Sequence, residues 1–191
     1  MKLLLTGVHG VGKSTVGTLV AQATGFPLWG ISDLLRKDLL DFAGSSYALR
    51  TMLNALPVQK RALVYQRVIN ALCELEHVIL EMPIVECESF GIMIPREPVL
   101  RLVPFDAFIL LEADAAAIHE RRMTRPPKKQ DPRYLTESAD EIGTHQELCR
   151  HMLIAFGVAL ARPAFIIRDA GNPSLTAQAV ISAITTARND V

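Results

Sequence analysis

The residues with the clearest chemical meaning lie near the start of the chain, in the stretch GVHGVGKST at residues 7–15. Gly7, Gly12, Lys13 and Ser14 fit the pattern G-x-x-x-x-G-K-[ST] at every fixed position. In such a loop, backbone N–H groups surround phosphate oxygens, the lysine reaches the β- and γ-phosphates, and the hydroxyl is a ligand of Mg²⁺. The pattern also occurs by chance, so the elements on either side of it must support the interpretation.

The sequence around this loop predicts a strand before it and a helix after it. The apolar run KLLLT at 2–6 is typical of a buried strand, and Val16, Leu19, Val20 and Ala23 recur with helical spacing. A helix that starts at the loop directs its positive end at a bound anion. We therefore interpret the stretch as a nucleotide-binding loop rather than as an exposed glycine turn.

The rest of the chain repeats this alternation of short apolar runs and helical patterns. Apolar stripes with helical spacing cover about 58–76 and about 137–160. Runs that are apolar on both faces are typical of a parallel sheet covered by helices on each side. The prediction is a doubly wound α/β fold whose further strands are HVILE at 77–81, AFILLE at 107–112 and AFIIRD at 164–169.

Composition narrows the class of protein. At 191 residues the chain suits one compact domain, and Lys plus Arg equals Asp plus Glu at 20 each, so no global charge attracts nucleic acid or an acidic membrane. No apolar run reaches the 18 residues of a membrane span. The 3 cysteines fit neither a disulfide framework nor a zinc pattern, which favours a reducing compartment, most simply the cytoplasm.

A basic cluster, RRMTRPPKKQDPR at 121–133, stands out in this neutral chain. Arg121 and Arg125 are four residues apart, so on a helix they share a face. A guanidinium suits phosphate oxygens through paired hydrogen bonds, and phosphoryl transfer gains from cations around the moving group. We interpret these two residues, with Arg122 and Arg133, as functional.

Two carboxylates stand where predicted strands end. Glu81 follows VIL, and we expect it to hold Mg²⁺, with Glu112 after FILL as the reserve. Glu112 equally suits the role of a cap for the helix that follows. His145 and Cys149, four residues apart, have no third ligand nearby, so we predict no metal other than magnesium.

Several segments in the same order resemble adenylate and related nucleoside monophosphate kinases, in particular the short archaeal adenylate kinases. The opening strand, loop and helix are similar, and SDLLRKDL resembles the segment in which an arginine, here Arg36, holds the AMP phosphate. ADEIGTHQELCRHMLIAFGVALA resembles the H-Q-E-x-x-R helix of the archaeal type, here His145, Gln146, Glu147 and Arg150. RDAGNPSLTAQAV resembles the loop whose backbone reads adenine.

The resemblance implies a fold and a reaction. The fold is a P-loop kinase domain over residues 1–191, a three-layer sandwich with a five-stranded parallel sheet, a segment for the nucleoside monophosphate near 30–57 and a short lid near 122–137. The reaction is MgATP + AMP ⇌ ADP + ADP, with Mg²⁺ as the cofactor and small-molecule nucleotides as the partners. Relatives of this type also suggest a homo-oligomer, either a trimer or a dimer.

The resemblance also implies groups of site residues. The predicted catalytic residues are Lys13, Arg121, Arg125 and Arg150. The predicted ATP-binding residues are Gly7, His9, Gly10, Val11, Gly12, Lys13, Ser14, Thr15, Arg121, Asn172 and Pro173. The predicted acceptor-binding residues are Ser32, Arg36 and Glu81, and the predicted magnesium ligands are Ser14 and Glu81.

The acceptor side departs from the family pattern. Glu81 stands where family members often have an aspartate, and EMPIVECE lacks the arginine that many adenylate kinases have there. Two alternatives therefore stand beside AMP phosphorylation: a P-loop kinase for another nucleotide or a nucleoside, and an ATP-binding regulatory switch with weak ATPase activity. The guanine-reading pattern N-K-x-D is absent, which argues against a guanine-nucleotide switch.

Overall fold

The computed structural model describes residues 1–39, 46–88, 91–93, 98–124 and 134–189. Its centre is a five-stranded parallel sheet with the strand order β2-β3-β1-β6-β7. The predicted α/β class with a five-stranded parallel sheet is therefore confirmed. The strands are β1 (Lys2–Thr6), β2 (Leu28–Gly30), β3 (Val78–Glu81), β6 (Ala107–Glu112) and β7 (Ala164–Arg168).

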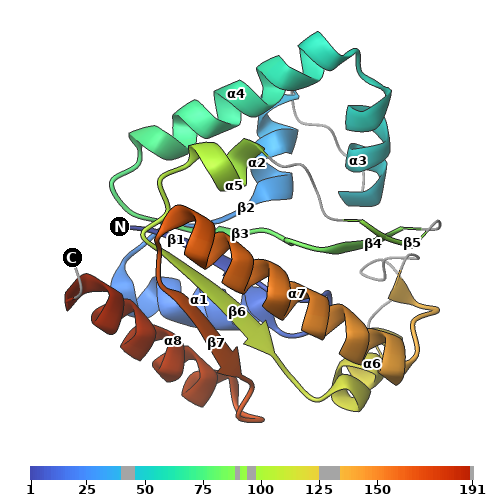
Figure 1. Ribbon diagram of the computed structural model, residues 1–191, viewed down its shortest axis with the longest axis vertical. Coiled ribbons are helices and arrows are strands. Elements are labelled where there is room, and N and C mark those ends of the chain that lie inside the picture. The colour runs from blue at the N-terminus through green and yellow to red at the C-terminus, as the bar shows by residue number, and fades with distance from the viewer. Residues whose placement is uncertain (40–45, 89–90, 94–97, 125–133, 190–191) are drawn as a thin grey trace.

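Helices cover both faces of this sheet (Figure 1). One layer contains α1 (Lys13–Thr24) and α8 (Pro173–Asn189), which pack against each other. On the opposite side α7 (Ala139–Leu160) lies over β6 and β7. The remaining helices are α2 (Ile31–Asp38), α3 (Ser46–Ala55), α4 (Val58–Glu74), α5 (Pro98–Leu102) and α6 (Ala115–Met123).

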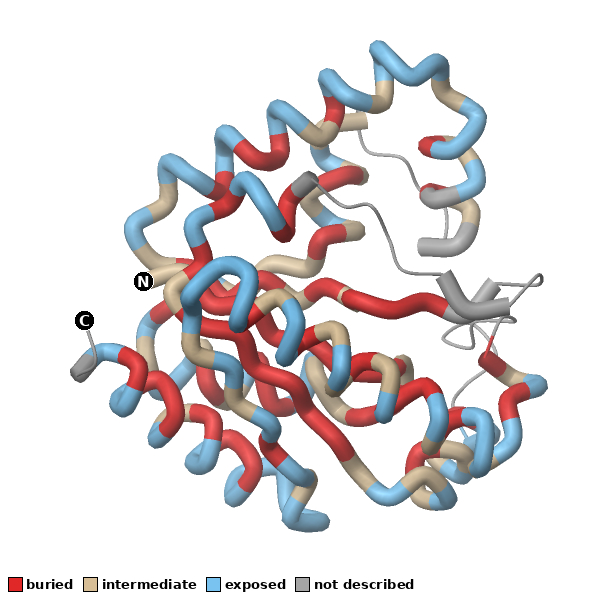
Figure 2. Tube along the Cα trace, viewed as in Figure 1, coloured by how far each residue is buried: buried red, intermediate tan, exposed pale blue. Residues whose placement is uncertain are grey.

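The central strands form the core. All residues of β6 are buried, and β1 is buried from Leu3 onward, as Figure 2 shows by the unbroken red tube through the middle of the molecule. Leu4 is paired with Leu80 on one side and with Phe108 on the other. Strands covered on both faces need apolar side chains on both faces, which explains the continuous apolar runs in the sequence.

Smaller elements occupy the stretch after β3. A two-stranded antiparallel sheet contains β4 (Glu86–Glu88) and β5 (Gly91–Met93), in a stretch of the sequence with prolines at 83, 95, 98 and 104. The predicted segment at 30–57 contains α2 and α3, while the predicted lid at 122–137 falls largely on residues 125–133, outside the described residues. In the part of the chain that the structure describes, no helix has the length and apolar character needed to cross a bilayer.

Candidate active site

The glycine-rich loop connects β1 to α1 at the carboxyl end of the sheet. Gly12 precedes the first residue of α1 and has a φ of 110°, a left-handed conformation that glycine adopts without a steric penalty. Within the loop the Val11 N–H donates to the Val8 carbonyl at 3.3 Å and closes a turn. The backbone N–H groups at the start of α1, together with the loop, form the kind of surface that binds phosphate.

Lys13 folds back over this loop. Its ammonium Nζ donates to the Gly7 carbonyl at 2.8 Å and to the Val8 carbonyl at 3.0 Å. An ammonium carries three donors and a compact charge, so in this position it can donate to phosphate oxygens as well as to these carbonyls. The predicted phosphate-binding lysine therefore lies against the loop that it is expected to serve.

Ser14 and Glu81 are brought together from residues far apart in the sequence. Ser14 is exposed in the first turn of α1, and its hydroxyl donates to Glu81 Oε1 at 3.0 Å. Glu81 ends β3, which lies beside β1 in parallel register. A hydroxyl and a carboxylate are oxygen ligands of the kind that Mg²⁺ takes alongside water and nucleotide phosphates, so the pair fits the predicted magnesium site.

Arg121 comes to the loop from the last turn of α6. Its Nη1 donates to the Val11 carbonyl at 3.4 Å, and its Nη2 donates to Asp169 Oδ2 at 2.7 Å. Burial opposes ionisation of the Asp169 carboxyl, but its hydrogen bonds from Arg121 and Thr176 outweigh that effect and hold its pKa below the usual value. Asp169 therefore anchors Arg121 beside the phosphate loop.

Arg150 lies on α7 and forms a two-pronged ion pair with Glu112. Its Nε donates to Oε1 at 2.9 Å and its Nη2 donates to Oε2 at 2.8 Å. The alternative in which Glu112 caps α6 is wrong, because Asp114 occupies that position and accepts from the Ala117 N–H at 2.9 Å. Both oxygens of Glu112 serve Arg150, so Glu81 and not Glu112 is the acid that meets Ser14.

Of the other predicted site residues, His9, Gly10, Val11 and Thr15 belong to the loop or the first turn of α1, whereas Ser32, Arg36, Asn172 and Pro173 lie on or next to other helices. Ser32 and Arg36 are on α2, and Arg36 Nη1 donates to Asp33 Oδ1 at 2.7 Å. Asn172 and Pro173 stand where α8 begins, and Asn172 Oδ1 accepts from the Ser174 N–H at 2.8 Å. Arg125 and Arg133 lie outside the described residues.

His145 and Cys149 do not form a metal site with neighbouring ligands. Both side chains are buried on α7, and burial chiefly raises the pKa of the Cys149 thiol to about 12. Across the described ranges, no group of three or more His, Cys, Asp or Glu side chains is arranged to hold a metal ion. His145 instead faces the Val85 carbonyl and the Glu137 carboxylate, each at 3.3 Å.

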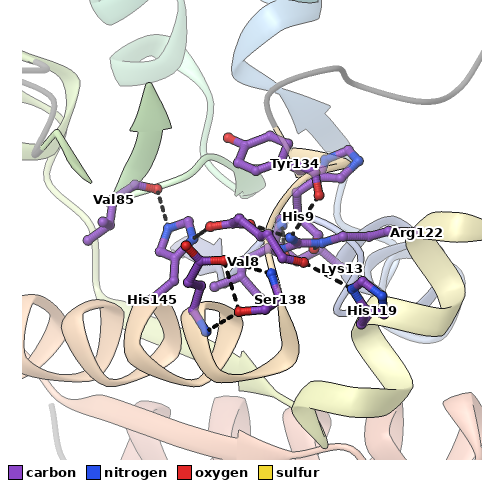
Figure 3. A network of polar contacts seen from close by, with 11 residues as sticks. Val8, His9, Lys13, Val85, His119, Arg122, Tyr134, Ser138 and His145 are labelled. Atoms are coloured by element: carbon purple, nitrogen blue, oxygen red, sulfur yellow. Dashed lines mark hydrogen bonds and ion pairs between the residues drawn. The ribbon is translucent and has the colours of Figure 1, made fainter. Parts of the chain in front are cut away.

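Sequence reasoning did not select three residues that the structure places around the loop. Asp169 follows β7, and its polar side chain at the end of a strand is the same signal that selected Glu81. Tyr134 and Glu137 belong to a buried polar network with Arg122 and His9, which Figure 3 shows at close range. No periodicity or motif marks them, because their partners come from distant parts of the chain.

Known proteins are similar to this chain in sequence. Residues 6–139 match the family model described as "AAA domain", AAA_17. An adenylate kinase of Thermoplasma volcanium is 27% identical over 192 aligned positions, covering 96% of this chain and 99% of the relative. An adenylate kinase of Thermoplasma acidophilum is 28% identical and covers 96% of this chain and 98% of its own.

Solved structures of small P-loop kinases have the same fold. A shikimate kinase from Bacteroides thetaiotaomicron superposes with a TM-score of 0.61 at 15% identity, covering 97% of this chain and 98% of that one. A deoxyadenosine kinase from M. mycoides gives a TM-score of 0.57 at 15% identity and covers 97% of this chain and 100% of that one. With its phosphate loop, its parallel sheet and a family match over most of its length, the chain belongs to the AAA domain family AAA_17.

Proposed function

We propose that the protein transfers the γ-phosphoryl group of MgATP to AMP and forms two molecules of ADP. The broader statement, that the chain is a phosphotransferase of the nucleoside monophosphate kinase kind, follows from its archaeal adenylate kinase relatives and its P-loop kinase fold. The identity of the acceptor and the roles of individual residues are the proposed part.

One observation carries the donor half of this proposal. Lys13, the Ser14–Glu81 pair and Arg121 all contact the loop or the first turn of α1. A kinase needs cations and a magnesium ligand around the β- and γ-phosphates, and needs little other chemistry from the protein. The convergence of these groups on one loop supports a phosphoryl donor site rather than a binding site for some other anion.

Each residue then has a role. Lys13 and Arg121 hold the donor phosphates and spread the charge that develops during transfer, and Arg150 adds a further cation from α7. Ser14 and Glu81 would hold Mg²⁺, which would supply positive charge to offset the charge of the donor phosphates. The predicted adenine contacts are Asn172 and Pro173, at the start of α8.

The acceptor would lie on the side of α2. Arg36 is the proposed ligand of the AMP phosphate, and Ser32 and Glu81 are the other proposed acceptor contacts. Transfer between phosphate oxygens depends on the alignment of the two substrates more than on a general base. It also requires that water be excluded, because water in the site would hydrolyse ATP. We assign the exclusion of water to the lid predicted at 122–137.

An acceptor panel tests the proposal. ADP formation from ATP is measured with each nucleoside monophosphate and with nucleosides, and we expect AMP to give the highest kcat/KM. Lys13→Met should abolish transfer, whereas Lys60→Met, a matched change at an exposed position on α4, should leave it unchanged. Slow ATP hydrolysis that no acceptor accelerates would refute the kinase and favour the regulatory switch.

Two further expectations belong to this proposal. We expect the enzyme to work in the cytoplasm, where its nucleotide substrates are available, and we expect a homo-oligomer of two or three copies. The long α7 would supply part of the interface, since Ile154 and Val158 on its outer side are 47% and 78% exposed.

A further inference from the structure

Arg122 is the largest side chain among those fully buried in the described part of the chain, with 2% of the side chain exposed. Arginine is almost never fully buried unless its charge is paired, because removing a guanidinium from water is costly. Its neighbour Arg121 remains 41% exposed at the phosphate loop. The two adjacent arginines of α6 therefore have different environments, and the buried one has no role in the site described above.

The guanidinium of Arg122 joins the phosphate loop to the segment that leads into α7 (Figure 3). Its Nε donates to the His9 carbonyl at 2.8 Å, and its Nη1 donates to the Tyr134 carbonyl at 3.4 Å. Nη1 also forms a short ion pair with the Glu137 carboxylate. The guanidinium lies 5.2 Å from the centre of the Tyr134 ring, within range of a cation–π contact.

The partners of Arg122 are themselves held in place. Glu137 Oε1 is 3.3 Å from His145 Nδ1, and the Glu137 carbonyl is 3.0 Å from a ring nitrogen of His119. The Tyr134 ring stacks on the His9 ring at 4.8 Å with planes 8° apart. The network therefore fixes both the direction of the guanidinium and the position of the loop residue that it contacts.

The aliphatic part of the Arg122 side chain also packs closely against the loop. A Cβ added at Gly10 would lie 3.0 Å from Arg122 Cγ and 3.3 Å from its Nε, which is tighter than ordinary side-chain contact. Because residue 10 is a glycine, no loop side chain competes with Arg122 for this space. Arg122 and Gly10 fit together, and the arginine reaches the peptide between His9 and Gly10 directly.

Contact with the His9 carbonyl has a consequence for phosphate binding. A trans peptide is planar, and its C=O and N–H point in opposite directions. Because Arg122 holds the His9 carbonyl, the Gly10 N–H of the same peptide points in the opposite direction, away from the guanidinium. Loops of this kind bind phosphate through such backbone N–H groups, and the orientation of each peptide decides which of them are available.

We propose that Arg122 is a positioning residue for the phosphoryl donor, which fixes the His9–Gly10 peptide so that the Gly10 N–H is available to the phosphates. The inference rests on the proposed function, because it assigns the loop to ATP. Glu137 takes part by holding the guanidinium in line with the carbonyl. Neither residue needs to touch the nucleotide.

The test uses the full-length protein and two variants near the loop. Arg122→Lys keeps the positive charge but lacks the planar fork that reaches the His9 carbonyl and Glu137 together. Glu137→Gln keeps the shape of the side chain and removes its charge. Arg188→Lys is the matched control, because Arg188 also lies over an aromatic ring, Phe26 at 5.2 Å, but on α8.

The affinity for ATP is measured by calorimetric titration without acceptor, together with the KM values for ATP and AMP and the melting temperature. We expect Arg122→Lys to weaken ATP binding about tenfold, equivalent to ~1.4 kcal/mol, with the KM for AMP within about twofold of the parent. Glu137→Gln should weaken ATP binding by a smaller factor. Arg188→Lys should change neither the affinity for ATP nor the KM for AMP.

Equal loss of ATP and AMP affinity, or a lowered melting temperature with unchanged ATP affinity, would show a purely structural role and overturn the proposal. If Arg122→Lys does not fold, Glu137→Gln decides by the same criterion. The titration does not depend on the acceptor. Variants that lose ATP affinity in a protein that phosphorylates no AMP would therefore support the role of Arg122 and refute the proposed acceptor.

Discussion

The two side chains of the Glu112–Arg150 ion pair differ in burial, so replacing one or the other should lower the stability of the fold by different amounts. The Glu112 side chain is 6% exposed and receives two hydrogen bonds from one guanidinium, while the Arg150 side chain is 37% exposed. Arg150→Met therefore leaves a buried carboxylate without its cation, whereas Glu112→Gln leaves a guanidinium that still reaches water. The two single variants should differ in stability although each breaks the same ion pair.

The expected magnitudes follow from that asymmetry. Removing one partner of a buried ion pair costs about 3–5 kcal/mol, and the access of water to the Arg150 side lowers the expected cost of Arg150→Met to ~2 kcal/mol. Glu112→Gln should cost ~1 kcal/mol, since a neutral hydrogen bond replaces a charged one. The double variant removes the stranded charge, so it should be more stable than Arg150→Met by ~1 kcal/mol.

Urea unfolding at pH 7, followed by circular dichroism, gives the free energy of unfolding of the four proteins in this cycle. The decisive comparison is between Arg150→Met and the double variant, because both lack Arg150 and differ only in the charge at residue 112. A double variant less stable than Arg150→Met by the full cost of Glu112→Gln would mean that the two changes add independently. That result would refute the buried, coupled pair.

Three further results are expected. Arg36→Ala should raise the KM for AMP by about tenfold or more and leave the KM for ATP nearly unchanged; equal effects in steady-state kinetics would remove Arg36 from the acceptor site. The Asp169 carboxyl has a lowered pKa, so its pairing with Arg121 stabilises the fold above the ordinary aspartate pKa of 3.8, and this stabilisation is lost as the pH falls below that value. The difference in the free energy of unfolding between the parent and Asp169→Asn, measured in urea, should therefore shrink as the pH falls from 7 to about 3. A difference that widens would contradict the pairing. Burial raises the pKa of the Cys149 thiol to about 12, so this thiol should not react quickly at pH 8. Cys149→Ser should therefore leave unchanged the number of thiols that react quickly with an aromatic disulfide reagent. The loss of one fast-reacting thiol in this variant would show that the Cys149 thiol is accessible.

Most of the sheet was predictable because its physical cause is local. Strands covered on both faces must be apolar on both faces, and this requirement appears in the sequence at 2–6, 77–81, 107–112 and 164–169. The strand β2 has only three half-buried residues at the edge of the sheet, so it produced no apolar run and was expected only from the family resemblance.

Side-chain pairing was less predictable, because partners are chosen by the fold and not by spacing. The sequence offered Glu112 only as a reserve magnesium ligand or a helix cap, and it offered Arg150 through the family resemblance. Neither pattern gave a sign that the two residues meet across 38 residues. Arg122 was interpreted as functional together with the other arginines of the basic cluster, yet its side chain is buried and its Nε contacts a carbonyl 113 residues away. Periodicity cannot distinguish two adjacent arginines when packing alone decides which one is buried.

The most direct test of the central claim follows the phosphorus atom itself. The protein is mixed with AMP and with ATP labelled in its γ-phosphate, and the products are separated after a few turnovers. Transfer to AMP predicts label in the β-phosphate of newly formed ADP, in step with the loss of ATP, and no label in ADP for Lys13→Met. Label released only as inorganic phosphate, at a rate that AMP does not change, would contradict the account.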